Sequence, residues 1–280
     1  MNRGRLYKPH FVFRPRQLVR RLAPLRDDVE LPWGTTINVN PKEMVGSGIA
    51  RTGIWELPVS ETVVRLLRRG DTAVDVGANV GYFTQLMARC VGPDGKVLAL
   101  EPHPVIAKRL RRNTLDPAEI VEAAASSRPG SARLAMPDGF DANQGTARLG
   151  GRGIEVRTVR LDDLVDAAAV VKLDCEGHEL EALEGAERLL ARGAVRNILF
   201  EEHATPPTPV TERLAGHGYT IFRLDESLLG PVLDGGRRHK ARWDAPNYIA
   251  SIEPETVRRR LRARGWRVLS ATYWRRFGGG

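Results

Sequence analysis

The chain has 280 residues, of which 42% are hydrophobic and 28% charged, a composition typical of a globular protein with one large α/β domain or two small ones. No run approaches about 18 apolar residues, so we expect no transmembrane helix, and the basic start lacks the apolar segment of a secretory signal. The two cysteines, Cys90 and Cys175, suit a reducing compartment, so we expect a cytoplasmic protein with structural thiols.

Positive charge is concentrated at the two ends of the chain. Residues 1–26 contain eight Arg or Lys and no acid, and residues 254–280 contain eight Arg and one Glu, whereas the net charge of the whole chain is only +9. The region between the ends is therefore acidic. Basic ends of this kind can bind nucleic acid or an anionic membrane, so peripheral contact with the inner membrane face is one hypothesis. A solvated surface in an arginine-rich chain is the simpler interpretation.

The first part of the chain, residues 1–59, is interpreted as a basic N-terminal segment and cap. Its pattern predicts a strand at 35–39 and a glycine-rich loop at 45–53. Ser60 is expected to cap a helix that Gly70 ends. Just before this helix, Trp55 and Glu56 are candidates for lining a cleft, with a core role equally open for Trp55.

The main domain is expected to span residues 60–253, followed by a basic helix and tail at 254–280. From residue 71 onward, strands and helices alternate, which predicts a largely parallel sheet with right-handed crossovers. The predicted strands are 73–76, 96–100, 120–125, 154–161, 170–175, 197–200, 219–224 and 247–252. The predicted helices are 82–90, 105–113, 179–191, 210–215 and 255–264. No full-length helix separates the last two strands, which favours an antiparallel closing hairpin.

A strand, a glycine turn and a helix follow one another at residues 73–90. The turn is Gly77-Ala78-Asn79-Val80-Gly81, and the helix has the apolar spacing of a buried stripe from Tyr82 onward. Glycines allow the backbone to approach a ligand closely, and a helix N-terminus offers free N–H groups. The turn lacks the Gly-x-Gly-x-x-Gly spacing of a dinucleotide site. It predicts a site for an adenosine-containing cofactor without identifying which one.

Glu101 narrows the choice of cofactor. It follows the next predicted strand, 26 residues after Asp75. A carboxylate in this place accepts hydrogen bonds from both hydroxyls of an adenosine ribose, which a 2′-phosphate would prevent. NAD and S-adenosylmethionine (SAM) are the two cofactors that remain.

Two further polar groups end neighbouring strands. The first is Lys172-Leu173-Asp174-Cys175-Glu176-Gly177-His178-Glu179, and the second is Glu201-Glu202-His203. Such carboxylates and imidazoles are able to deprotonate a substrate hydroxyl or to hold a divalent cation. Their spacing does not define a metal site, and we predict none. The candidates for a base or substrate-orienting residue, in order, are His178, Asp174, Glu202, Glu176 and His203.

Taken together, these motifs resemble FkbM-type methyltransferases over roughly residues 50–252. The most specific part is the Lys-x-Asp-x-Glu-Gly-x-Glu block at 172–179, which ordinary dehydrogenases lack. The resemblance implies a class I methyltransferase Rossmann-like fold, with a mostly parallel seven-stranded sheet, an antiparallel closing hairpin and an N-terminal lead-in. It also implies SAM-dependent O-methylation of a hydroxyl in a sugar, glycan or secondary metabolite.

The resemblance also assigns residues to the cofactor. It implies that the glycine turn holds the methionine end of SAM, that Glu101 holds the ribose and that Asp174 lies beside the methyl group. The full expected set is Asp75, Gly77, Ala78, Asn79, Gly81, Tyr82, Glu101, Pro102, Ser126 and Asp174. Ser127 stands where many relatives carry an acid near the adenine, so we expect backbone and packing to recognise that base.

Two other functions stay open at this point. The basic ends point to a nucleic-acid methyltransferase, although the sequence has no Asn-Pro-Pro-Tyr-like motif and no basic stretch interleaved with aromatic residues for base stacking. A binding module that holds the cofactor without chemistry is the other alternative. Residues 138–153 and 225–245 are the expected acceptor-selecting segments, but they reveal neither the acceptor nor the oligomeric state.

Overall fold

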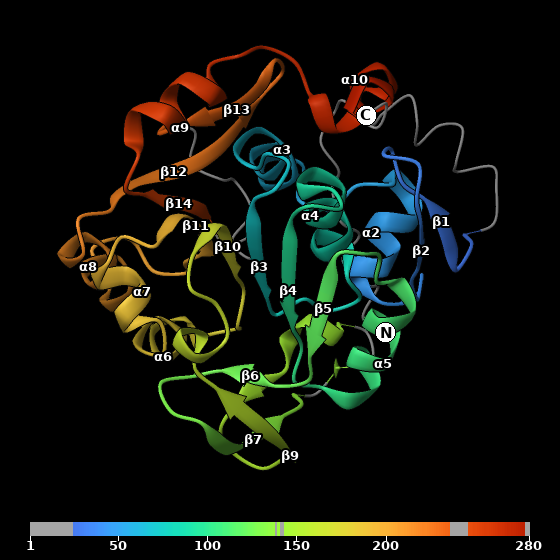
Figure 1. The fold of residues 1–280 in the computed structure, drawn as a ribbon. Coiled ribbons are helices and arrows are strands. Elements are labelled where there is room, and N and C mark those ends of the chain that lie inside the picture. The colour runs from blue at the N-terminus through green and yellow to red at the C-terminus, as the bar shows by residue number, and fades with distance from the viewer. Residues whose placement is uncertain (1–24, 138, 141–142, 236–245, 278–280) are drawn as a thin grey trace.

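The computed structural model describes residues 25–137, 139–140, 143–235 and 246–277. Within these residues, eight strands form one central sheet in the order β13-β12-β14-β11-β10-β3-β4-β5 (Figure 1). The strands are β3 (Thr72–Val76), β4 (Lys96–Leu100), β5 (Ala118–Val121), β10 (Ala168–Leu173), β11 (Val195–Glu201), β12 (Thr220–Ser227), β13 (Gly230–Leu233) and β14 (Asn247–Ser251). The run from β11 to β5 is parallel, whereas β14 is antiparallel to both β11 and β12.

The predicted α/β class, the largely parallel sheet and the antiparallel closing strands are therefore confirmed. The described sheet has one strand more than expected, because β13, within the segment 225–245, forms a hairpin with β12. The Ser227 hydroxyl fixes the turn, accepting from the Leu229 N–H and donating to the Gly230 carbonyl. The turn residues themselves, Leu228 and Leu229, carry no turn signature.

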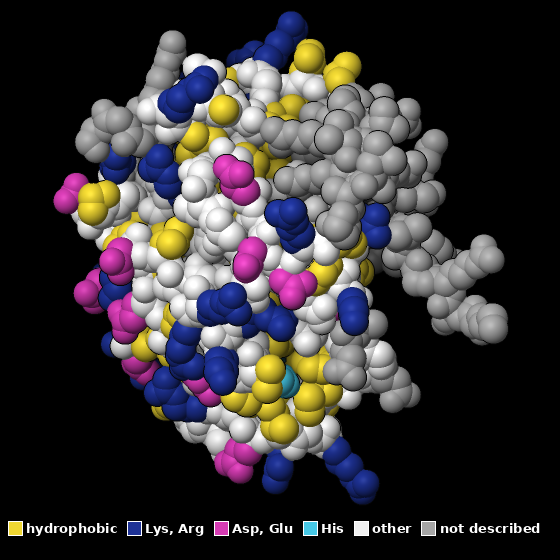
Figure 2. Space-filling model, turned by 90° about the vertical axis from the view of Figure 1, so that its right-hand side faces the viewer, with side chains coloured by type: hydrophobic (Ala, Val, Ile, Leu, Met, Phe, Trp, Pro, Cys, Tyr) yellow, Lys and Arg dark blue, Asp and Glu magenta, His cyan; other side chains and the backbone are white. Residues whose placement is uncertain are grey.

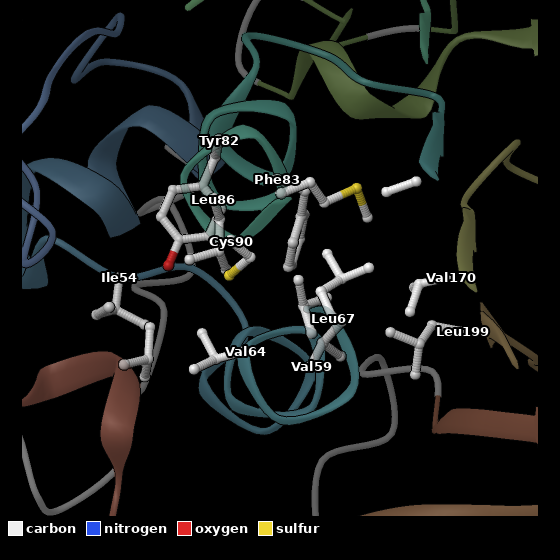
Figure 3. Packing of buried hydrophobic residues seen from close by; sticks show 14 of the residues in the cluster. Ile54, Val59, Val64, Leu67, Tyr82, Phe83, Leu86, Cys90, Val170 and Leu199 are labelled. Atoms are coloured by element: carbon white, nitrogen blue, oxygen red, sulfur yellow. The ribbon is translucent and has the colours of Figure 1, made fainter. Parts of the chain in front are cut away.

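Helices cover both faces of the sheet. Around α3 (Leu57–Leu66) and α4 (Tyr82–Val91), one core cluster includes Val170 and Leu199 of the sheet (Figure 3). On the other face, α6 (Glu179–Glu184), α7 (Glu187–Ala191) and α8 (Pro209–Gly216) form a second cluster. The alternation of side chains along each strand supplies both clusters, because successive residues point to opposite faces.

The lead-in segment differs from its prediction at two places. The expected loop at 45–53 is wrong, because α2 (Met44–Thr52) occupies it. The Glu43 side chain caps the helix by accepting from two backbone N–H groups of the first turn, and Gly53 ends it in a left-handed conformation. Position 46 of this helix requires glycine, because a Cβ there would meet the backbone of Asn40. Gly46, one of the glycines that predicted a loop, is thus required by close packing.

Ser60 does not cap α3, which begins three residues earlier with Glu56 at its N-cap position. Instead, Ser60 lies inside the helix, where its hydroxyl donates to the Trp55 carbonyl at 2.6 Å and lies 3.1 Å from the Tyr82 hydroxyl. The expected boundary between residues 59 and 60 therefore falls within α3, which belongs to both the lead-in and the main domain.

Two predicted elements are each divided in the structure. The strand expected at 120–125 becomes β5 of the central sheet and β6 (Ala124–Ala125), which joins a second sheet with β7 (Gly130–Ala135), β8 (Arg148–Leu149) and β9 (Ile154–Val159). The helix expected at 179–191 is interrupted at Gly185, where a Cβ would meet the carbonyl oxygen of Ser126. Other elements are β1 (Asp28–Glu30), β2 (Thr36–Asn38), α5 (Pro104–Asn113), and the 3-10 turns η3 (Gln144–Thr146) and η4 (Leu161–Asp163).

The basic C-terminal stretch packs onto the domain. It forms α9 (Pro254–Leu261), η5 (Arg267–Leu269) and α10 (Ala271–Phe277), of which only the first is predicted from the sequence. Val257, Val268 and Trp274 are buried in the core cluster around α3 and α4. The fully buried Arg65 of α3 donates to carbonyls between α9 and η5.

The distribution of surface charge and the length of the helices are relevant to the hypothesis of membrane contact. On the face shown in Figure 2, Lys and Arg side chains are interspersed with Asp and Glu. No described helix has the length and apolar character needed to cross a bilayer. Residues 1–24, which carry the N-terminal basic charge, lie outside the described residues.

Candidate active site

A cavity lies at the carboxyl ends of the parallel strands β11, β10, β3 and β4. Its floor comes from the residues that directly follow these strands, including Gly77, Glu101, Asp174 and the strand-end residue Glu201. Trp55 and Glu56 approach from the start of α3, and residues 143–145 approach from the segment before β8. The sheet topology thus gathers residues that are far apart in the sequence, at the edge where open α/β sheets bind ligands.

The glycine turn between β3 and α4 is shaped by close backbone approach. Gly77 has a φ of 77°, and a Cβ there would meet the carbonyl oxygen of Asp174 on the neighbouring strand end. Gly81 has a φ of 93° and precedes the first residue of α4. Both positions require a residue without a side chain. The turn therefore leaves its backbone open to the cavity.

Glu101 is positioned by the backbone around it. The carboxylate accepts from the Asn79 N–H at 3.0 Å and from the His103 N–H at 2.9 Å, and the side chain is only 6% exposed. Burial raises the pKa of Glu101 to about 7. The carboxyl thus links the end of β4 to the glycine turn while it lines the cavity.

Three cavity residues other than glycine have left-handed backbone conformations. They are Glu56 with a φ of 42°, Asn79 with 49° and Glu176 with 53°. Such conformations are uncommon for residues with side chains, and they tend to occur where function requires a particular geometry. Their convergence on one cavity marks it as a functional site independently of any motif.

The block at 172–179 forms a tight arrangement after β10. Lys172 is 5% exposed, and its Nζ lies 2.8 Å from Asp174 Oδ2 and 4.8 Å from the ring centre of Phe83. Glu179 accepts from the N–H groups of Cys175 and Gly177 at 2.9 and 3.2 Å, which holds the turn between β10 and α6. The spacing of the motif therefore has a structural reason: one acid orders the turn that presents the others.

Lys172 is surrounded by carboxyl groups. Burial alone lowers the pKa of the ammonium, but the charges of Asp174, Glu56 and Asp75 outweigh burial and raise it. Burial raises the pKa of both Glu56 and Glu201, and the charge of Glu56 raises that of Glu201 further. Glu201 and Asn247 of β14 adjoin Glu56 and partly offset the rise in its pKa.

Unpartnered polar atoms surround the glycine turn. Within the described part of the chain, Asp75 Oδ1 and Asn79 Oδ1 are buried and have no hydrogen-bond partner. The other carboxylate oxygen of Asp75 accepts from the Thr84 hydroxyl at 2.6 Å. Because buried polar atoms are almost always partnered, the free oxygen of Asn79, which lines the cavity, indicates that a ligand completes the site. A cradle with free acceptors fits the amino and hydroxyl groups of SAM.

His178 and Glu176 have partners of their own at the cavity. His178 Nε2 lies 3.0 Å from the Ser126 hydroxyl and its Nδ1 lies 3.4 Å from Glu181. Glu176 lies 3.8 Å from the exposed Arg148, and burial together with the charge of Asp174 raises its pKa to about 7. Both side chains are therefore held at the cavity edge.

A family model described as the methyltransferase FkbM domain matches residues 75–221, more than half of the chain. The chain belongs to the FkbM methyltransferase family. It is therefore a SAM-dependent methyltransferase, and the expected family, enzyme class and cofactor are confirmed.

Two relatives share 28% and 30% of their aligned residues with this FkbM methyltransferase. It is 28% identical over 218 residues to the hexuronic acid methyltransferase AglP of Haloferax volcanii, an alignment that covers 71% of this chain and 89% of the relative. It is 30% identical over 203 residues to the 31-O-demethyl-FK506 methyltransferase FkbM of Streptomyces tacrolimicus, covering 58% of this chain and 77% of that protein. A solved SAM-dependent O-methyltransferase from Thermotoga maritima matches with a TM-score of 0.42 and 18% identity, over 73% of this chain and 68% of that chain.

The structure brings most of the expected site residues to the cavity. Those that line it are Gly77, Ala78, Asn79, Tyr82, Glu101, Pro102, Asp174, Glu176 and His178. Asp75, Gly81 and Ser126 do not line the cavity. Asp75 accepts from Thr84 of α4, Gly81 directly precedes α4, and the Ser126 hydroxyl lies 3.0 Å from His178 Nε2. The FkbM methyltransferase thus folds three separated sequence blocks, 77–82, 101–102 and 174–178, into one site.

Glu202 and His203 do not reach the cavity lining, contrary to our expectation for a catalytic role. Glu202 accepts from the Thr208 hydroxyl at 2.6 Å and from the Ala204 N–H at 3.0 Å, so it orders the loop before α8. His203 is exposed. The preceding residue, Glu201, lines the cavity instead, because neighbouring residues at a strand end point to opposite sides.

The register of the sheet is the signal that identifies Glu201. Leu173 pairs with Phe200 across the parallel strands β10 and β11, so the next residues, Asp174 and Glu201, are neighbours. Lys172 is part of the motif but absent from our expected site residues. It lies on β10 and also lines the cavity. The described residues contain no group of three or more His, Cys, Asp or Glu arranged to hold a metal ion.

Proposed function

We propose that this enzyme transfers the methyl group of SAM to a hydroxyl oxygen of a sugar, glycan or secondary-metabolite acceptor. The main support is the cluster of carboxyl groups at the β10 and β11 end of the cavity, where Asp174 is the candidate proton acceptor and Glu56 and Glu201 lie beside it. A hydroxyl is a poor nucleophile unless its proton is removed, so this chemistry needs a base. The names of the two relatives, a hexuronic acid methyltransferase and an FK506 methyltransferase, are consistent with such acceptors.

The reaction divides between cofactor and protein. The sulfonium of bound SAM supplies the activated methyl group. The glycine turn and Glu101 hold the cofactor, and Asp174 orients the acceptor hydroxyl and takes its proton. Lys172, at 2.8 Å from Asp174, fixes that carboxylate and balances its charge.

Replacing Asp174 with asparagine tests this role. The change keeps the shape and the hydrogen bond to Lys172 but removes the proton acceptor, so we expect methyl transfer to fall by about 100-fold or more. SAM affinity, measured by isothermal titration calorimetry, should change less than about threefold. Transfer is followed with isotope-labelled SAM and a pool of glycosides and hydroxylated metabolites, and the product should be a base-stable methyl ether.

A matched control for this variant is Glu119→Gln, on the exposed side of β5, which should keep full activity. Undiminished transfer in Asp174→Asn would contradict the proposed base. Products that are base-labile methyl esters, or transfer only to nucleic acid, would contradict the proposed acceptor class.

SAM affinity should also depend on pH through Glu101. Its pKa is raised to about 7 by burial in the free protein, and the ribose hydroxyls bind the ionised form. Protonation therefore competes with binding, and we expect the Kd for SAM to rise about tenfold from pH 8 to pH 6. Calorimetry across this range measures how the Kd for SAM depends on pH. The variant Glu101→Gln should bind SAM more weakly, and its Kd should change little with pH. An equal slope in the variant would assign the effect to another group.

A further inference from the structure

The cavity has one end at β4 and another at β11, and the order of the strands keeps these two ends apart. Glu101 follows β4 and Glu201 ends β11, with β3 and β10 between them. Three strand spacings place these carboxyls ~14 Å apart across the sheet. Since the proposed function places the ribose of SAM at Glu101 and the methyl group at Asp174, the space beside Glu201 is left for the acceptor. This inference therefore depends on the proposed function.

Glu56 and Glu201 form a pair at the acceptor end. Glu56 comes from the N-cap position of α3 and has a left-handed backbone, and Glu201 is the last residue of β11. Both side chains line the cavity, and the carboxyl of Glu56 lies close enough to raise the pKa of Glu201. Neither makes the backbone caps that Glu43, Glu101 and Glu179 make, since α3 has no side-chain cap from Glu56. The pair is held in place without an evident structural duty.

The charges around the pair favour a shared proton. Asp75, Asp174, Glu56 and Glu201 converge on one ammonium group, Lys172, which forms its direct ion pair with Asp174. Two carboxyls in contact do not both ionise in a buried site. A pair that holds one proton offers carboxylate oxygens that accept and an O–H that donates. It is therefore suited to a ligand with two adjacent groups that each donate and accept hydrogen bonds.

We propose that Glu56 and Glu201 together bind two neighbouring hydroxyls of the acceptor, so that the substrate class is a vicinal diol such as a sugar ring. One hydroxyl of the diol is the one methylated beside Asp174, and its neighbour anchors the ring. An acceptor with a carboxylate in the anchoring position is excluded, because it would meet like charge in a buried site. An isolated hydroxyl lacks the second anchor and binds more weakly.

The experiment uses small probes and the full chain loaded with S-adenosylhomocysteine. Binding of cis-1,2-cyclohexanediol, cyclohexanol and cyclohexanecarboxylate is measured by ligand-observed NMR titration. We expect the diol to bind at least about tenfold more tightly than the alcohol, since it gains one charge-assisted hydrogen bond, and the carboxylate to bind no better than the alcohol. Equal affinities for the diol and the alcohol, or no binding of the diol up to its solubility, would overturn the proposal.

Variants connect any preference to the pair. The double variant Glu56→Gln/Glu201→Gln should reduce the diol preference to less than about threefold, while Glu184→Gln on α6, whose side chain is 40% exposed, should keep it. Thermal unfolding and calorimetry with SAM show that the variant is folded and binds cofactor. A preference that persists in the double variant overturns the assignment to the pair.

The same measurements separate this inference from the proposed function. Methyl transfer to hydroxyls without any diol preference overturns the inference and leaves the function standing. A diol preference without transfer to any hydroxyl overturns the function instead.

Discussion

Replacing Gly77 with alanine is expected to reduce SAM affinity more than tenfold and to destabilise the protein by about 2–5 kcal/mol. The new Cβ would meet the carbonyl oxygen of Asp174, which belongs to backbone in the centre of the sheet and is not free to move. The φ of 77° adds a conformational penalty for any residue with a side chain. Relief of the clash requires β3 and β10 to separate at the cavity floor, which displaces both the glycine turn and Asp174.

Gly70→Ala is the matched control. Gly70 has a φ of 80°, but nothing lies within 4 Å of the position of its Cβ. This variant should show only the conformational penalty of about 1–2 kcal/mol and unchanged SAM affinity. Urea unfolding and calorimetry with SAM measure the two effects. If both alanine variants lost the same stability and neither lost affinity, close approach of the backbone would not be the reason for Gly77.

Arg65→Met should have the largest effect on stability, a loss of about 3–5 kcal/mol. The guanidinium is fully buried, lies 2.6 Å from Glu61, and donates to the carbonyls of Leu261, Ala263 and Gly265 at 3.0, 2.6 and 2.6 Å. Methionine fills much of the volume but leaves Glu61 Oε1 and these carbonyls without their donor, while Glu61 Oε2 still accepts from the Val268 N–H at 2.8 Å. Denaturant unfolding measures the loss.

The pH dependence of this loss provides the check. Burial already raises the pKa of Glu61, partly offset by Arg65, so removing the arginine raises it further. When the pKa of an acid is raised in the folded state, the free energy of unfolding falls as the pH rises through that pKa. Protonation of Glu61 at low pH therefore restores part of the lost stability. The destabilisation should therefore be smaller at pH 5 than at pH 8. Arg68→Met, an exposed position just past the helix, should have little effect, and a pH-independent loss would refute the buried-charge explanation.

Local patterns predicted the parts of the fold and site that depend on neighbouring residues in the sequence. The strand, turn and helix at 72–91 were evident because apolar spacing and glycines act within a few residues. The glycines of α2 led to the wrong prediction of a loop, and for Gly46 the structure shows the reason, which is close packing against Asn40. Helix α10 was missed because its burial depends on the partners of Trp274 in the folded core.

At the β11 end of the cavity, too, the residues that face inward depend on tertiary contacts and not on local sequence patterns. Sequence alone placed a polar group at 201–203, but which of these residues faces inward depends on strand register and on the last residue of β11. A shift of one residue exchanges Glu201 for Glu202. Glu56 joins the site only through the tertiary placement of α3, where a left-handed N-cap residue replaces the predicted serine cap. The family match spans residues 75–221, so it includes Glu201 but not Glu56.

Helix α3 carries Glu56 at its first end and Arg65 in its last turn. A helix of ten residues is a rigid rod of ~15 Å, so its two ends move together. Arg65 therefore anchors the C-terminal segment to the same rigid element that brings Glu56 to the cavity, so the wall of the cavity and the end of the described chain share one helix.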